Sequence, residues 1–558
     1  MRYRNAWQCC LLAGVFLASV CGSATVTTAT TFTWTQPNGC GILSCDFFNP
    51  NFWSPAGGPP GTGDRATISM SGNIHLSQST EVLDNLTLET STQMRTFGNR
   101  LNVSNSPGNF FLFGSGFLGS TYLRVDPGGG FEVTARTISL HQGSELFLAG
   151  GGVTVTFRLL VSSSSLVSGN GVIGLVGNQI GSALELTGKL RPSGGDMTII
   201  SPNSFLDLDG NLVGTEPGFV DVTSSGNLIL NGEHFDPFSG RFDIGNNRSV
   251  TFDSPFSVDG ELNVTSAISN RLVGPMFSFL SGAMLSNNQS ALRIEGESRW
   301  EDGAGVSLTT ATARLLLDGD STIEEGASFT GDGLLTNSSG FEMSLRDGAQ
   351  IGVGLRNDGT LLVGESPGIA SLGNFTQGSN GSLSIELGGV MPGEFDALAI
   401  SGDAQFAGVL NVDLLSPFSL GAGQSFEIID VAGTRTGTFA GLGENALVGN
   451  FGGTDLFISY AGGDGNDVVL FTDGTPGDFD NDGDVDGRDF LVWQRNPSVG
   501  NLADWQANYG ASFTAAATAV PEPGTLVTLL AILGMGLFKK RGTYHGTFSR
   551  LPCALFRF

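Results

Sequence analysis

Apolar and polar residues alternate with a period of two along much of this 558-residue chain. The alternation is clear in FEVTARTISL (131–140), VTVTFRLLV (153–161), ALELTGKL (183–190) and ELNVT (261–265). Gly, Asn, Ser and Asp separate such runs, as expected for strands that end in tight turns. No helical period of 3.6 residues interrupts them between residues 81 and 400. The pattern predicts many short β-strands and almost no helix.

Strands this short and this evenly separated favour a parallel β-solenoid, with an array of β-sandwiches as the alternative. Asn337 and Asn357 lie 20 residues apart, and each opens a turn before a new strand. Asparagines at the same turn of successive coils can hydrogen-bond along the axis, so we expect coils of about 20–25 residues. The predicted fold is all-β, with solenoid repeats over residues 81–400 and a C-terminal β cap over 401–470.

Four segments carry a family resemblance. Residues 321–337, 357–389, 394–415 and 426–439 resemble the distal part of autotransporter-like β-strand repeat proteins of environmental bacteria. The resemblance implies a right-handed parallel β-helix that is closed by a C-terminal cap.

The N-terminus has the pattern of a secretory signal peptide over residues 1–24. Arg2 and Arg4 precede an apolar run from Leu11 to Val20, and Ala24 ends a small-x-small cleavage site. The remainder of the chain is therefore expected to be exported to the cell surface or the extracellular space.

Residues 25–80 combine Trp34 and Trp53 with Pro/Gly-rich turns. Aromatic rings beside turns suit an N-terminal cap over the first coil of a solenoid. A carbohydrate-stacking site could use the same tryptophans. An oxidising compartment permits a disulfide between Cys40 and Cys45 but does not require one.

Composition and charge exclude one class of partner. The formal net charge is −27, and the chain has three lysines, Lys189, Lys539 and Lys540. Since no basic patch is available to neutralise phosphates, nucleic-acid binding is not expected. The 84 glycines are about twice the usual share, and they fit a chain of many turns.

The strongest chemical motif is DFDNDGDVDGRD, residues 478–489. It fits the loop pattern of calcium-binding EF-hands, with Asp in the closing position. In that pattern five aspartates supply side-chain oxygens, Asp484 supplies its backbone carbonyl and Gly483 makes the sharp turn. We therefore predict one bound Ca²⁺ with six ligand residues: Asp478, Asp480, Asp482, Asp484, Asp486 and Asp489.

This loop and the helix FLVWQR after it resemble one half of a type I dockerin repeat. The second half, within residues 478–510, repeats a Trp-Gln pair at Trp505 but has no ligand loop. The resemblance implies a small α-helical, EF-hand-type calcium module, with a cohesin-like protein as a possible partner. The missing second loop puts paired calcium sites and tight cohesin binding in doubt.

The C-terminal end resembles the PEP-CTERM sorting signal of exported bacterial proteins. An Ala/Thr linker (511–519) leads to Val520-Pro521-Glu522-Pro523, an apolar run and the basic cluster Lys539-Lys540-Arg541. The resemblance implies a transmembrane sorting helix within residues 520–541 and processing by an exosortase-type enzyme near the Pro-Glu-Pro motif. Residues 542–558 form a tail that such signals normally lack.

Other candidate sites have plain structural explanations. Glu295, Glu297, Glu301 and Asp302 surround Trp300, and are either an acidic catalytic patch or ordinary ladder charges beside Arg293 and Arg299. Residues 462–470 resemble one copy of a calcium β-roll repeat, and a turn before a final strand is the better interpretation. His75, His141 and His234 are widely spaced and have no nucleophile motif beside them.

The expected function is that of a non-enzymatic structural or adhesive protein of the surface or matrix, with a calcium module and a processed anchor. The alternative is a polysaccharide lyase or glycoside hydrolase with a β-helix fold. A groove that collects carboxylates and basic residues would favour the enzyme, whereas a groove of Ser, Asn and Gly would favour the structural function.

Overall fold

The structure is a computed structural model. It describes residues 29–35, 45–69, 71–103, 109–113, 121–128, 130–177, 182–208, 217–234, 237–265, 268–364, 367–421, 423–473, 477–480, 484–497 and 502–510. The predicted signal peptide, linker, sorting helix and tail lie outside these residues. The chain divides into two units: Met1–Ile385 with Ala397–Asn411 and Ile429–Gly441, and Glu386–Asp396 with Val412–Ile428 and Leu442–Phe558.

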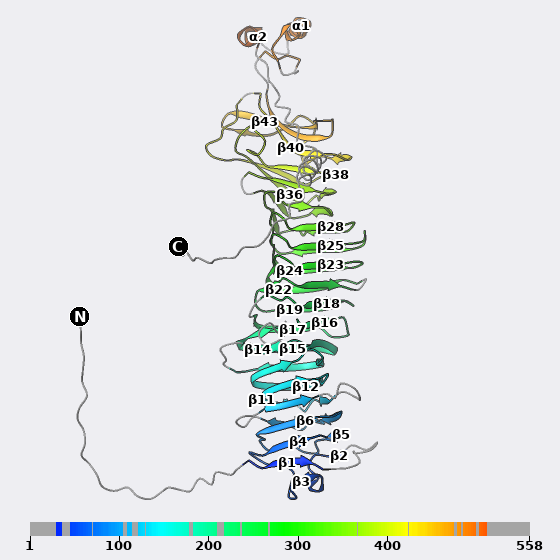
Figure 1. Ribbon diagram of the computed structural model, residues 1–558. Coiled ribbons are helices and arrows are strands. Elements are labelled where there is room, and N and C mark those ends of the chain that lie inside the picture. The colour runs from blue at the N-terminus through cyan, green and yellow to red at the C-terminus, as the bar shows by residue number, and fades with distance from the viewer. Residues whose placement is uncertain are drawn as a thin grey trace, which may run out of the picture. The chain divides into compact units, whose positions relative to one another are not determined.

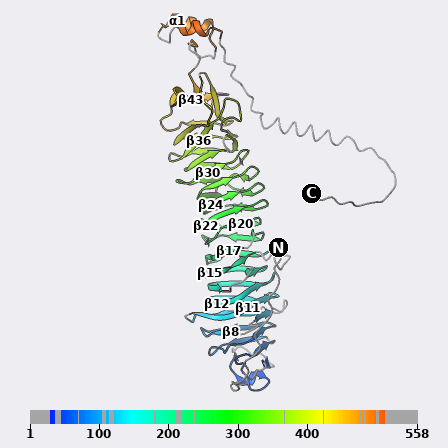
Figure 2. The same cartoon turned by 90° about the vertical axis from the view of Figure 1, so that its left-hand side faces the viewer.

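The first unit is a parallel β-solenoid, which confirms the predicted fold class at this level. Figures 1 and 2 show its coils stacked in chain order. Three ladders of parallel strands run along it, and we call them face 1, face 2 and face 3. Between residues 81 and 470, the described part of the chain contains no helix.

Face 1 is formed by β2 (Cys45–Asp46), β5 (Gly72–His75), β7 (Thr92–Arg95), β10 (Tyr122–Val125), β12 (Glu145–Val161), β13 (Leu166–Leu175), β15 (Lys189–Asp207), β16 (Phe219–Val222), β18 (Arg241–Ile244), β21 (Glu261–Val264), β23 (Met284–Asn287), β25 (Gly305–Leu308), β28 (Ser328–Gly331), β31 (Gln350–Ile351), β34 (Ile369–Leu372), β37 (Ala397–Ile400) and β40 (Ser425–Val431). Face 2 takes further parts of β12, β13 and β15. It also contains β8 (Leu101–Val103), β11 (Phe131–His141), β17 (Leu228–His234), β19 (Ser249–Phe252), β22 (Asn270–Phe279), β24 (Ala291–Trp300), β26 (Arg314–Asp318), β29 (Leu334–Asn337), β32 (Gly354–Asn357), β35 (Phe375–Gln377), β38 (Ala404–Phe406) and β41 (Arg435–Gly437).

Face 3 takes the ends of the longest strands. It also contains β1 (Thr31–Trp34), β4 (Arg65–Ile68), β6 (Asn85–Leu88), β9 (Asn109–Phe113), β14 (Ser182–Leu186), β20 (Phe256–Val258), β27 (Ser321–Ile323), β30 (Glu342–Leu345), β33 (Thr360–Val363), β36 (Ser382–Leu387) and β39 (Val409–Leu414). Gly296 lies where β24 bends from face 2 to face 3. Its φ is +144°, and a Cβ there would lie 1.9 Å from the carbonyl oxygen of Gly274. Only glycine fits this corner without displacing the neighbouring coil.

The core fills the space enclosed by the three faces because every second residue of each strand points inward. On face 1 the inward positions of successive coils include Leu262, Leu285, Val306 and Phe329, and all are buried. Each such side chain contributes roughly 1.5–3 kcal/mol of burial free energy. Pairing partners follow one another at 20–23 positions from Phe242 to Leu372, in agreement with the expected coil length.

Parallel pairing already begins at β1, which pairs with β4 inside the segment assigned to the N-terminal cap. There β3 (Trp53–Ser54), which follows the short 3₁₀ helix η1 (Pro50–Phe52), pairs with β1 in the antiparallel direction. Trp34 and Trp53 are buried against each other with ring centroids 5.0 Å apart, and Trp53 Nε1 donates a hydrogen bond to the Phe47 carbonyl. Buried rings are not available for stacking on a sugar.

The second unit contains the antiparallel strands β42 (Ala446–Phe451), β43 (Thr454–Gly462) and β44 (Asp467–Thr472). It also contains the helices α1 (Gly487–Arg495) and α2 (Leu502–Asn508). None of the helices in the described part of the chain is long and apolar enough to cross a membrane.

Candidate functional site

The acidic loop, residues 478–489, ends in the first turn of α1. Asp486 is the N-cap of this helix, and its Oδ1 accepts a hydrogen bond from the Arg488 N–H at 2.6 Å. In return, Asp489 Oδ2 accepts from the Asp486 N–H at 2.7 Å. This reciprocal capping box fixes the last two acidic residues of the loop on the helix.

Asp489 is the centre of the loop. Its side chain is fully buried, and its Oδ1 also accepts from the N–H groups of Phe479 at 2.6 Å and Asp480 at 3.0 Å. Burial raises the pKa of the Asp489 carboxyl, but the N–H donors of Asp486, Asp480 and Phe479 lower it, and the net pKa is below its ordinary value. Asp489 is therefore ionised at neutral pH and joins the two ends of the loop.

Five of the six predicted ligands fall into two groups of three that share Asp489. One carboxylate oxygen each from Asp478, Asp480 and Asp489 lie within 4.8 Å of one another, and the same holds for Asp484, Asp486 and Asp489. Among the described residues, no other three His, Cys, Asp or Glu side chains bring their ligand atoms this close together. Asp482 and Gly483 lie outside it. The oxygen donor set fits a hard divalent cation such as Ca²⁺. Asp484, which was expected to offer only its backbone carbonyl, also brings its carboxylate into the second group.

The nonapeptide-like stretch at residues 462–470 forms the turn between β43 and β44, followed by most of β44. Asp467 pairs with Gly462 across this hairpin. The stretch is thus a turn before a final strand, as the preferred interpretation held.

The acidic patch around Trp300 does not converge. Glu295 pairs with Arg271, Arg293 pairs with Asp318, and Arg299 pairs with Glu301 and Glu324. Trp300 is fully buried and stacks on Phe279 at 3.9 Å. Because Glu295 and Glu301 are held by different arginines and the Trp300 ring is in the core, these residues act as ladder charges and as core.

The histidines lie on different coils, at the ends of β5, β11 and β17. Burial lowers the pKa of His234 to about 4, and Asp253 opposes this effect. This imidazole is therefore neutral at physiological pH, and it contacts Phe252 and Phe256.

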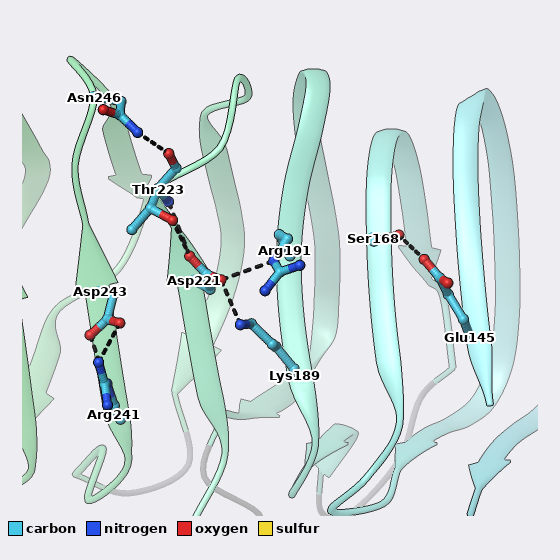
Figure 3. Close-up of polar contacts among 9 residues, drawn as sticks. All are labelled: Glu145, Ser168, Lys189, Arg191, Asp221, Thr223, Arg241, Asp243 and Asn246. Atoms are coloured by element: carbon cyan, nitrogen blue, oxygen red, sulfur yellow. Dashed lines mark hydrogen bonds and ion pairs between the residues drawn. The ribbon is translucent and has the colours of Figure 1, made fainter. Parts of the chain in front are cut away.

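Face 1 carries an outward ladder of polar side chains that the sequence analysis missed (Figure 3). Asp221 accepts from Lys189 at 2.6 Å and from Arg191 at 2.9 Å, both on the preceding coil. Arg241 pairs with Asp243 on its own strand, and the Lys189 ammonium lies 4.1 Å above the Phe219 ring. Arg191 and Asp221 lie 30 positions apart, so no local motif could reveal their pairing.

An open groove of about 570 Å³ crosses the corners between face 1 and face 2 on consecutive coils. Its lining has one basic and one acidic side chain, Arg314 and Asp332. The other lining residues are Ala311, Gly331, Gly333, Leu334, Gly352, Gly354, Gly373, Asn374, Ser401 and Gly402. This composition is the one that we associated with a structural function rather than with a polysaccharide-cleaving enzyme.

Comparison with known proteins gave no match, either among the protein families or among the curated proteins.

Proposed function

We propose that the protein is an exported structural or adhesive component of the cell surface or extracellular matrix. In this proposal a right-handed β-helical ectodomain carries a dockerin-like calcium module and is sorted by a PEP-CTERM anchor that an exosortase-type enzyme processes. The ectodomain would contact extracellular polysaccharide or a cohesin-like protein.

The approach of four aspartates to Asp489, in two groups of three that share it, is the observation that carries the calcium part of this proposal. Carboxylates this close repel one another unless a cation lies between them. One Ca²⁺ would be bound by side-chain oxygens of the acidic loop, and it would offset this repulsion.

Two observations support a non-enzymatic role for the solenoid. Glu295 and Glu301 near Trp300 are held in ion pairs with different arginines, and the groove between faces 1 and 2 has a mostly small and neutral lining. General acid–base chemistry on a polysaccharide needs two carboxyl groups on either side of the scissile bond, and the groove lining includes a single carboxylate.

Export is supported by the leader pattern and by one cysteine. Cys45 is disulfide-bonded, and a disulfide is typical of an oxidising compartment outside the cytosol. The candidate partner that the sequence offers, Cys40, lies outside the described residues.

Calcium titration of the exported chain tests the proposal. We expect one Ca²⁺ per chain in isothermal calorimetry. Asp489→Asn should raise the calcium Kd at least about tenfold, because its amide nitrogen would face N–H donors and its charge would be lost. Asp480→Asn is the matched control, since the loop motif accepts Asn at this position and an oxygen ligand remains.

The effect of Asp480→Asn on the calcium Kd should be clearly smaller than that of Asp489→Asn. A stoichiometry of two ions, no uptake of calcium, or equal losses from the two substitutions would contradict the proposed site.

A further inference from the structure

The second helix contacts the acidic loop although it contributes no ligand. Trp505 Nε1, on α2, donates a hydrogen bond to the backbone carbonyl of Asp486 at 2.7 Å. Two residues after α2, the Gly510 N–H donates to the carbonyl of Val485 at 2.8 Å. These bonds reach two consecutive loop residues directly before α1, and Val485 is fully buried.

The same helix also contacts the other end of the loop. Gly477, directly before Asp478, has φ +111°, and a Cβ there would lie 2.6 Å from the Cα of Trp505. The backbone at residue 477 therefore packs directly on the backbone of α2. We call Trp505 and Gly510, with the surface of α2 that Gly477 touches, the α2 clamp.

The position of the clamp matters because the two groups of carboxylates come from the two ends of the loop. Asp478 and Asp480 follow Gly477, and Asp484 and Asp486 flank Val485; Asp489 belongs to both groups. Without a cation their mutual repulsion favours an open loop. Contacts at both ends oppose that opening.

We propose that the α2 clamp is a positioning element that keeps the acidic loop in its ion-binding shape, so that calcium affinity depends on a half-repeat that contains no ligands. The inference rests on the proposed calcium function. If the closed loop is populated only in part, the apparent Kd rises in inverse proportion to that fraction. The clamp raises the fraction before the ion arrives, and thereby lowers the apparent Kd.

Trp505 contributes both a hydrogen bond and aromatic packing to the clamp, and one substitution distinguishes these two contributions. The Trp505 ring lies 5.0 Å from the Phe490 ring and 5.0 Å from the Tyr509 ring. Trp505→Phe retains an aromatic ring for these contacts and removes the indole N–H, which is the only donor of the side chain. Trp300→Phe makes the same change in the solenoid, where Nε1 has no hydrogen-bond partner among the described residues.

The test is a calorimetric titration of the full-length exported chain with CaCl₂. Trp505→Phe should raise the Kd between about two- and tenfold, the range for one neutral hydrogen bond, with the stoichiometry still at one. Trp300→Phe should leave the Kd unchanged. Gly477→Ala, which displaces α2 from the other side, should also raise the Kd.

Hydrogen exchange supplies a readout that a change in packing alone would not give. The amides of Phe479 and Asp480 donate to Asp489, so their exchange reports the closed loop. In calcium-free protein Trp505→Phe should speed their exchange while the amides in the middle of α1 stay protected. Saturating CaCl₂ should restore their protection.

The possible failures are distinct. If the unsubstituted chain takes up no calcium, the proposed calcium function fails. If it binds calcium and Trp505→Phe binds equally well with unchanged exchange at Phe479 and Asp480, the calcium function stands and the clamp is overturned.

Discussion

At the scale of single residues, several charges on the solenoid are neutralised by ion pairs with the neighbouring coil. Asp221 illustrates this: it is 5% exposed yet accepts from Lys189, Arg191 and Thr223. Burial by itself raises the pKa of Asp221. The three donors lower the pKa by more than burial raises it, so that the net pKa is about 2. The carboxylate therefore stabilises the fold only while it is ionised.

Asp221→Asn is expected to destabilise the solenoid at pH 7 by about 2 kcal/mol, the equivalent of a pKa lowered from 3.8 to about 2. A folded-state pKa below the unfolded one gives stability that is complete above about pH 4 and is lost as the pH falls towards 2. Urea unfolding at a series of pH values measures this difference. The two proteins should converge near pH 2, and a constant difference across the series would contradict the assignment.

At the scale of elements, buried amides connect successive coils along face 2. Asn337 Nδ2 donates to Asn357 Oδ1 at 2.8 Å, and Asn357 Nδ2 donates to Gln377 Oε1 at 2.9 Å. All three side chains are buried. The 20-residue spacing of the two asparagines predicted this contact, and the structure confirms it. Gln377 lies 20 positions further on and was missed because it is not an asparagine.

Asn357→Ala should lower the free energy of unfolding by roughly 2–4 kcal/mol, because several buried polar groups would lose a partner. These include Gln377 Oε1 and the Ser382 carbonyl, to which Asn357 Nδ2 donates at 2.9 Å. Asn263→Ala is the matched control. Asn263 is half-buried on the outward side and makes one bond of 3.2 Å to Asp243, so we expect a loss below about 1 kcal/mol. Similar losses from both variants in urea unfolding would show that the ladder contributes nothing particular.

At the scale of the whole molecule, the proposal depends on the two ends of the chain, which lie outside the described residues. The order of the Pro-Glu-Pro motif, the apolar run and the basic cluster indicates a processed anchor. The order of positive, apolar and small residues at the N-terminus indicates removal of residues 1–24.

In a host that has an exosortase, mass spectrometry of the exported protein should find a new N-terminus at Thr25 and no peptides after about Pro523. Replacing Pro521-Glu522-Pro523 by alanines should leave the anchor attached while the N-terminal cleavage stays the same. Peptides from Tyr544 to Phe558 outside the cell would count against processing of the unsubstituted chain.

Local pattern by itself determined the strands and the acidic loop. Alternation decides which side chains enter the core, so Leu262 and Val306 can be assigned from the sequence. The loop is equally local, because its ligands and its capping box lie within twelve positions. Neither the alternation of a strand nor the ligand spacing of the loop depends on residues that are distant in the chain.

The tertiary structure alone decided which distant residues meet. Partners on face 1 are 20–23 positions apart from Phe242 to Leu372, but 28 and 31 positions separate Leu372, Ile400 and Val431. A side chain's neighbour on the next coil depends on the lengths of the intervening turns, which alternation does not specify. The pairing of Lys189 with Asp221, and the contact of Trp505 with the acidic loop, could therefore be seen only after the coils and helices were placed.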